Sequence, residues 1–379
     1  MYVYSDDEKE KEMTKTLSWV WLTSSLKFSS RAIARVLYKF TPYEAYCADE
    51  DTLKAAGIDG DTAEKLLDKD TALACRIVEK CEKENIKIIP SSSPDYPRAL
   101  ERLPDKPFVL YVKGDITCIN GRKTAAFVGT RRMTAEGHQN GERIAQELID
   151  SGYVLISGLA SGIDTVAAEM SIKKNVPTVA VLGVDIDKYF PAENTRLTDR
   201  VAETGAVISE YPPYTGARFF PARNRIIVGL SDIVNVIESP SKSGSMITGR
   251  LSLKMKIPTY ALCLEGSSFD GCRELVVNGA LPIGSTKTEA AKKAPVKKTP
   301  SVKKVPSPKK KEPEKETKSI PDDVVGTRRY IWEKLLSGPV GENALVDSSH
   351  SIQEVLCALT ELELDGYIRA LPGGRYALK

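Results

Sequence analysis

The spacing of apolar positions changes along the chain and divides it into regions. From Lys15 to about Glu84 the apolar residues recur every three or four positions, as at Ile33, Val36 and Leu37, which is the spacing of amphipathic helices. The next stretch, to residue 115, contains five prolines and two short β-rich runs, at 86–89 and 108–112. Because proline interrupts helices, we expect short strands here.

The central part of the chain alternates strand-like and helix-like segments. Strands are expected at 125–129, 153–157, 177–182, 206–209, 233–237 and 259–263, and helices at 135–149, 164–174, 193–203 and 245–256. The strand segments are runs of Val and Ile without polar alternation, as expected when both faces of a sheet are covered. This order predicts a doubly wound, Rossmann-like parallel α/β sheet in a domain spanning residues 85–284.

Two different regions follow the α/β domain. Residues 285–320 are rich in Lys, Pro, Ala and Thr and nearly free of large apolar residues, so we expect a disordered linker. In residues 321–379, helices are expected at 328–336, 342–346 and 352–364, followed by a hairpin of 367–371 with 375–378. Three helices and a hairpin predict a C-terminal winged-helix domain.

The net charge of +3 is unevenly distributed. Residues 285–320 contain twelve Lys against four Glu, so the rest of the chain has a net charge of −5. A nucleic-acid contact in the folded regions must therefore be local, whereas the lysines of the linker either hold a phosphate backbone loosely or only form a spacer. The expected recognition helix of the winged-helix domain contains Glu354, Glu361 and Glu363 and neither Lys nor Arg, which favours protein contact or packing over DNA reading.

Three loops of small polar residues follow expected strands. They are Gly129-Thr130-Arg131-Arg132, the run from Ser157 to Asp164, and the run from Ser243 to Thr248. In a doubly wound sheet, the carboxyl ends of the strands face one crevice. Glycines and helix N-termini there allow backbone N–H groups to approach an anion, and the arginines add charge. The hydroxyl groups that could donate to phosphate belong to Ser157, Ser161, Ser243, Ser245 and Thr248.

The sequence lacks the motifs of several other kinds of binding site. Neither the dinucleotide fingerprint G-x-G-x-x-G nor the Walker A pattern occurs, so no nucleotide cofactor is expected. The chain has two histidines and seven scattered cysteines without a C-x-x-C pair, so neither a metal site nor a disulfide framework is expected. It contains no membrane-length apolar run and no secretory signal pattern, so we expect a cytoplasmic protein without membrane contact.

Two local patterns have alternative interpretations. The run from Arg218 to Arg225 combines three arginines, Asn224 and two phenylalanines, which suits single-stranded nucleic acid, although Phe219 and Phe220 are also typical of a buried structural loop. The stretch 56–60 resembles a helix-hairpin-helix turn that presents N–H groups to a phosphate, but it is also typical of a plain connection in a helical bundle.

Several motifs, in order, resemble the DprA/Smf family of DNA-processing proteins. The similar runs are 127–131 (FVGTR), 157–164, 180–183, 187–194 (DKYFPAEN), 208–213, 220–229 (FPARNRIIVG) and 243–248 (SGSMIT), preceded by 94–97 and 110–115. The sequence departs from the family pattern at four places. Thr130 stands where the family often has Ser, Ala168 where it commonly has His, and Ala222 where it has an arginine. The run Gly271-Cys272-Arg273 stands where it usually has Gly-x-Asn. The resemblance spans residues 86–284, and the two ends are similar to the family's helical appendage, of SAM or helix-hairpin-helix type (residues 1–84), and its winged helix.

The resemblance implies a function. Members bind single-stranded DNA, usually as homodimers, protect incoming DNA and help load the RecA recombinase in natural transformation. The positions implied to contact DNA are Gly129, Thr130, Arg131, Ser157, Gly158, Arg223, Asn224, Arg225, Ser243 and Gly244, to which the loop pattern adds Ser161, Gly162, Ser245 and Thr248.

Two other classes of function remain open. The fold resembles that of phosphoribohydrolases, which cleave nucleoside monophosphates with a loop glutamate, but the comparable stretch here, 243–250, has no carboxylate. Asp164 and Glu210 are conceivable catalytic carboxylates, although each could equally cap a helix or hold a loop. The other class is a nucleotide-sensing regulator that signals through the winged helix. We expect a binding protein without catalytic residues.

Overall fold

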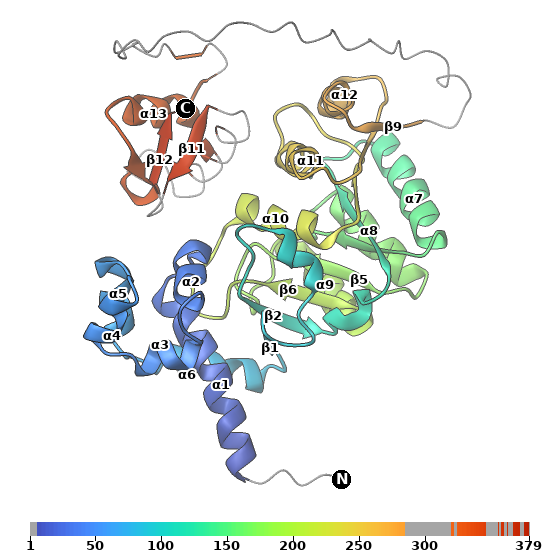
Figure 1. Cartoon of the computed structure of the whole chain (residues 1–379). Coiled ribbons are helices and arrows are strands. Elements are labelled where there is room, and N and C mark those ends of the chain that lie inside the picture. Colours follow the sequence, from blue (N-terminus) through green and yellow to red (C-terminus); the bar gives the residue numbers. More distant parts are fainter. Residues whose placement is uncertain are drawn as a thin grey trace, which may run out of the picture. The chain divides into compact units, whose positions relative to one another are not determined.

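The computed structural model describes residues 6–284, 320–321, 324–345, 355, 358–359, 362, 367–371 and 375–378. The chain forms two compact units, residues 1–283 and 284–379, which are described separately (Figure 1). The expected linker, apart from Ile320, and most of the expected helix at 352–364 lie outside the described residues. None of the described helices is long and apolar enough to cross a membrane.

The N-terminal part of the first unit is helical. Its helices are α1 (Asp6–Ser25), α2 (Ser30–Leu37), α3 (Pro42–Cys47), α4 (Glu50–Ala55), α5 (Gly60–Leu67) and α6 (Ala72–Lys83). The turn between α4 and α5 is the stretch that resembles a helix-hairpin-helix. There the Asp59 carboxylate accepts a hydrogen bond from the Thr62 amide (3.0 Å) and pairs with Arg35. A carboxylate already caps this helix N-terminus, which favours the plain helix connection over a phosphate contact.

The rest of the first unit is built on one sheet. Its strands are β1 (Lys87–Pro90), β2 (Val109–Gly114), β3 (Lys123–Val128), β4 (Tyr153–Ser157), β5 (Thr178–Val181), β6 (Ala206–Ser209), β7 (Ile233–Val236), β8 (Thr259–Leu262) and β9 (Leu281–Ile283). The spatial order is β1-β2-β6-β5-β4-β3-β7-β8-β9. The pairings from β6 across to β9 are parallel, and β1 and β2 add an antiparallel extension at the β6 side. The prediction of a doubly wound α/β fold is confirmed.

Helices cover both faces of this sheet. Helices α7 (Ala135–Asp150), α8 (Ile163–Lys173) and α9 (Thr195–Thr204) lie on one face, and α10 (Phe220–Leu230), α11 (Gly244–Lys254) and α12 (Asp270–Val277) lie on the other. Alternate residues of a strand enter opposite cores: Ala126 and Val128 of β3 face α10–α12, whereas Ala125 and Phe127 face α7 and α8. Helices α1–α6 share a core with β2, β5 and β6 on the α9 side, so they pack directly on the sheet.

Helix α10 has no counterpart among the expected elements. From Arg223 onward most of its residues are buried, including Asn224 and the run Ile226–Leu230. A helix surrounded by protein has no polar stripe, so its sequence shows no helical period. The run from Arg218 to Arg225 is therefore not simply a loop, because its second half is the first turn of a buried helix.

The second unit contains α13 (Thr327–Leu336), β10 (Val340–Gly341), β11 (Ile368–Leu371) and β12 (Arg375–Leu378). The strands form an antiparallel sheet in the order β10-β12-β11. Helix α13 contributes Ile331, Trp332 and Leu335 to a core that also contains Leu345 and Ile368. The prediction of a winged-helix domain is confirmed, and its acidic recognition-helix residues Glu354, Glu361 and Glu363 lie outside the described part.

Candidate nucleic-acid interface

Strands β3, β4 and β7 bring the three small-residue loops to one edge of the sheet. β3 pairs in parallel with β4 on one side and with β7 on the other, so the loops that follow them leave from the same end. The chain order reverses between β3 and β7, which is where doubly wound sheets bind ligands. The expectation that these loops share an edge is confirmed.

A pocket of about 160 Å³ lies at this edge, next to the second loop. It is lined by Arg131, Gly158, Ala160, Ser161, Phe190, Pro191, Phe220 and Arg223. Four of these are site residues predicted from the sequence, namely Arg131, Gly158, Ser161 and Arg223. Phe190 and Pro191 were not predicted; they belong to the DKYFPAEN run after β5, and only the membership of that run in the family pattern could have indicated them.

The wall of the pocket is aromatic and cationic. The ring centroids of Phe190 and Phe220 are 4.9 Å apart, with their planes inclined by 37°. The Arg131 guanidinium carbon lies 5.6 Å from the centroid of the Phe220 ring, and the Arg131 side chain is exposed. Phe190 is 37% exposed, so its ring offers surface to a ligand. Phe219, in contrast, packs on Tyr211, with a centroid distance of 5.1 Å. Planar rings beside a guanidinium suit an unstacked base and an adjacent phosphate.

Arg223 lines the pocket and is almost completely buried. Its guanidinium donates hydrogen bonds to the carbonyl oxygens of Gly158 (3.0 Å) and Val181. A Cβ atom at Gly158 would lie 2.4 Å from Nη2 of Arg223, so only glycine leaves room for this guanidinium. Burial lowers the pKa of Arg223 to about 10, against the opposing effect of Asp164. The side chain thus remains cationic at neutral pH.

Asp164, near the start of α8, lies behind the same loop. One carboxylate oxygen accepts a hydrogen bond from the Gly158 amide (2.9 Å), and the amides of Ala160 and Gly129 favour the charged form of this carboxylate. Burial raises the pKa of Asp164 to about 6, although Arg223 and the three amides favour the charged form. The backbone N–H groups that the sequence offered to a phosphate are here directed to an internal carboxylate.

The other residues of the second loop also serve the loop itself. Ser157 is buried, and its hydroxyl donates to the Asp164 carbonyl (3.2 Å). Ser161 donates to the Glu193 carboxylate. Gly162 has φ +85°, and a Cβ there would lie 2.3 Å from the Thr130 carbonyl oxygen.

Residues of the first loop are also in contact with the protein. A Cβ at Gly129 would meet the Ile163 side chain at 2.6 Å. The Thr130 hydroxyl accepts from the Arg132 amide (3.2 Å).

The third loop is more open. The hydroxyl oxygens of Ser239, Ser243 and Ser245 lie 2.7–2.9 Å apart at the start of α11. Thr248 is 1% exposed and Ser245 is 8% exposed, so these two do not reach the surface. Gly244 is exposed, and a Cβ there would have no protein atom within 4 Å. Ser243 and Gly244 are therefore the predicted residues of this loop that a phosphate can approach.

Two other predicted residues of α10 are bonded to protein groups and do not line the pocket. Asn224 is buried and connects Arg223 (Nε to Oδ1, 3.2 Å) with the Gly244 carbonyl (3.4 Å). Arg225 donates to both carboxylate oxygens of Glu210 (2.6 and 2.9 Å) and to the Asp105 carboxylate (2.9 Å). Although burial disfavours its charge, Glu210 and Asp105 raise the pKa of Arg225 above its ordinary value. The structure does not bring Arg225 into the pocket.

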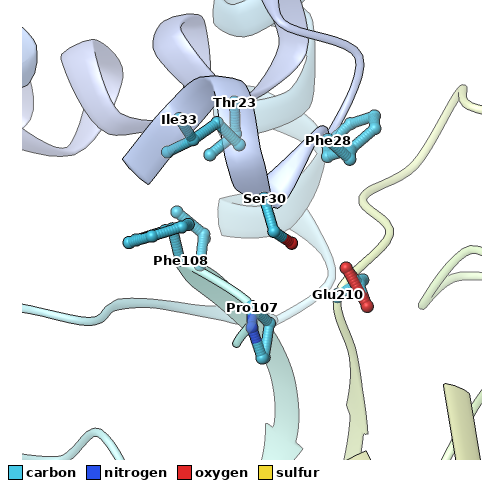
Figure 2. Close-up of a pocket in the computed structure, with 8 residues that line it drawn as sticks. Thr23, Phe28, Ser30, Ile33, Pro107, Phe108 and Glu210 are labelled. Atoms are coloured by element: carbon cyan, nitrogen blue, oxygen red, sulfur yellow. The ribbon is translucent and has the colours of Figure 1, made fainter. Parts of the chain in front are cut away.

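Glu210 lies in a different setting from the pocket. Figure 2 shows it beside Pro107, near Ser30 of α2 and Phe28 of the turn between α1 and α2. The cavity between these groups measures about 10 Å³, which is roughly the space of one water molecule. No substrate fits there, and the carboxylate is already paired with Arg225. Within the described residues, no three His, Cys, Asp or Glu side chains are grouped so that they could hold a metal ion.

The chain is similar to known DNA-processing proteins. The family described as DNA recombination-mediator protein A matches residues 87–293, and the DprA winged helix domain matches residues 313–374. The DNA processing protein DprA of Bacillus subtilis is 38% identical over 218 residues, which are 56% of this chain and 73% of that protein. Protein Smf of Synechocystis sp. is 31% identical over 332 residues, 79% of this chain and 82% of that protein. The X-ray structure of DprA from Streptococcus pneumoniae aligns with a TM-score of 0.60 and 29% identity, covering 69% of this chain and 92% of that one.

Proposed function

Because the chain belongs to the DNA recombination-mediator protein A family, as its motifs predicted, we propose that it binds single-stranded DNA at the pocket lined by Arg131, Phe190, Phe220 and Arg223. In this proposal the protein is a binding protein and not an enzyme. It holds incoming single strands, protects them and presents them to a RecA-type recombinase in natural transformation.

The observation that carries the proposal is the composition of the pocket. It combines an exposed guanidinium, an aromatic pair and a glycine loop in about 160 Å³. Bases of a duplex are stacked and paired, so their faces cannot reach such a wall, whereas bases of a single strand can. The pocket therefore favours single strands over duplex.

The third loop extends this site along the strand. Asn224 connects the first turn of α10 to Gly244 through a hydrogen bond, so the pocket and the N-terminus of α11 are joined by this side chain. A helix N-terminus with exposed backbone is a favourable place for a phosphate. We assign Ser243 and Gly244 to a phosphate next to the base that occupies the pocket.

The arrangement of carboxylates supports binding rather than catalysis. Asp164 is buried among three amides and Arg223, and Glu210 is paired with Arg225 beside a cavity the size of a water molecule. A general acid or base must reach the reacting group of a substrate. Neither carboxylate lines the pocket, so neither supports the alternative of a phosphoribohydrolase.

The remaining partners follow from the family. We propose that the protein acts as a homodimer in the cytoplasm, where single-stranded DNA and the recombinase are found. The net charge of −5 outside residues 285–320 supports a compact DNA site on the first unit rather than a broad basic surface. The lysines of residues 285–320 are then a secondary, salt-sensitive contact.

The test is a binding titration of the full chain with labelled oligo-dT and with a duplex of the same length, at several salt concentrations. We expect tighter binding of the single strand and a steep loss of affinity as salt rises. AMP incubated with the same protein should release no adenine. Equal affinity for duplex would assign the contact to the lysine-rich segment, and release of adenine would favour the phosphoribohydrolase.

A further inference from the structure

We propose that Asp164 is a positioning residue of the DNA pocket, whose ionised carboxylate holds the loops after β3 and β4 and the Arg223 guanidinium in the arrangement that binds single strands. This inference rests on the proposed function, because the pocket it concerns is the proposed DNA site. Asp164 itself is not among the residues that line the pocket.

The contacts of Asp164 join three elements. Its carboxylate accepts a hydrogen bond from the Gly158 amide in the loop after β4. The amides of Ala160 in the same loop and of Gly129 in the loop after β3 favour its charged form. Gly158 and Ala160 are part of the pocket wall. A change at this one carboxylate therefore reaches both loops at the sheet edge.

The third element is α10, on which Asp164 acts through the charge of Arg223. This guanidinium is 6% exposed, donates to the Gly158 carbonyl and contributes to the pocket. The charged groups that act on it are Asp164, which favours its charge, and Arg131 from the loop after β3, which opposes it. Without the negative charge of Asp164, the buried guanidinium keeps only its neutral acceptors, two backbone carbonyls and the Asn224 side-chain oxygen, and is repelled by Arg131.

Protonation of the Asp164 carboxylate would change both its charge and its hydrogen bonding. An ionised carboxylate only accepts hydrogen bonds, whereas a protonated one uses one oxygen as a donor. The hydrogen bond from the Gly158 amide then meets a neutral, weaker acceptor, and Arg223 loses its counter-charge. We expect the loops to move away from the shape that forms the pocket.

The same proton has opposite effects on folding and on binding. The pKa of Asp164 is about 6 in the folded protein against 3.8 for the free side chain, so on acidification the folded state takes up this proton before the unfolded state does. The contribution of Asp164 to stability therefore increases as the pH falls from 7 to 5, while the affinity for DNA decreases. General loosening of the protein would instead lower stability and affinity together.

The experiment measures the affinity of the full chain for oligo-dT by fluorescence anisotropy between pH 7.5 and 5.0 at constant ionic strength. If binding needs the ionised form, the Kd at pH 5 should be about tenfold higher than at pH 7.

Three variants test whether the pH dependence of DNA binding comes from Asp164. Asp164→Asn should bind weakly at every pH and show no decrease on acidification, and Asp164→Glu should regain part of the pH dependence. Asp150→Asn, at an exposed carboxylate of α7, should keep the wild-type profile. In thermal unfolding, the stability of the wild type relative to Asp164→Asn should increase as the pH is lowered.

The outcomes separate the two proposals. A wild-type protein that does not bind oligo-dT at pH 7.5 would overturn the proposed function. Binding that stays constant or tightens down to pH 5 would leave the proposed function intact and overturn the role of Asp164. If Asp164→Asn does not fold, the comparison of Asp164→Glu with Asp150→Asn still tests whether the pH dependence comes from Asp164.

Discussion

The second loop (residues 157–164) and the third loop (residues 243–248) have the same kind of sequence but different uses for it. In the second loop the protein itself fills the space that glycine leaves: Arg223 packs against Gly158, and the Thr130 carbonyl packs against Gly162. In the third loop no protein atom occupies the space beside Gly244. Small residues after a strand can therefore serve either the fold or a ligand, and only the neighbouring atoms distinguish the two.

Helix α10 shows the same contrast between its two arginines. Residues two apart on a helix point about 200° away from each other. Arg223 therefore faces the pocket, whereas Arg225 faces Glu210 and Asp105. The following variants test whether residues used by the fold and residues open to a ligand separate as the structure indicates.

The largest effect should come from Arg225→Ala, as a loss of stability. It leaves the Glu210 carboxylate, whose side chain is 6% exposed, without its partner. Breaking such a buried pair costs about 3–5 kcal/mol in the free energy of unfolding, measurable by denaturant titration. Arg225→Ala/Glu210→Gln should recover part of the loss. A stable Arg225→Ala protein with weakened DNA binding would instead support the DNA contact that the family resemblance implies.

Gly162→Ala should also reduce stability, by about 2–4 kcal/mol, because it combines a left-handed backbone with a clash against the Thr130 carbonyl. Gly152→Ala is the matched control. Its φ of +84° is almost the same, but no atom lies within 4 Å, so only the backbone strain of about 1 kcal/mol remains. Equal losses for the two variants would show that the close approach of the first and second loops contributes nothing.

Arg131→Ala should weaken binding of oligo-dT by about 1–3 kcal/mol without changing the thermal unfolding temperature, because this exposed guanidinium is available to a phosphate. Arg122→Ala removes the same charge just before β3, at the opposite end of that strand, and should bind nearly as the wild type does. If both variants lose affinity equally, the effect is one of net charge and not of the pocket.

The smallest effect is expected for Gly244→Ala. The fold has room for the methyl group, so stability should remain unchanged, while the affinity for oligo-dT should fall by about 1 kcal/mol because the methyl group blocks close approach of a phosphate. Gly60→Ala provides the comparison in the N-terminal turn, where a Cβ also has open space. Loss of affinity with Gly60→Ala alone would move the phosphate contact to the N-terminal helices.

The sequence determined much of the architecture by itself. Runs of Val and Ile separated by helical segments predicted strands β3 to β8 of the sheet and helices α7, α8, α9 and α11, because burial on both faces leaves a clear composition. It did not reveal α10, since a helix buried all round has no amphipathic period. The ordered motifs identified the family, because several independent short runs in the same order carry more information than any one of them.

Only the tertiary structure decided what each site residue does. The sequence placed Arg131, Arg223 and Arg225 around one sheet edge, but the rotation of α10 directs Arg225 to Glu210 and Asp105. It offered the loop amides to a phosphate, whereas the fold directs those of Gly129, Gly158 and Ala160 to Asp164. It gave no spatial reason to choose Phe190, which joins the pocket because the segment after β5 meets the start of α10. Residue type and spacing specify which groups are present, whereas packing specifies which of them a ligand can reach.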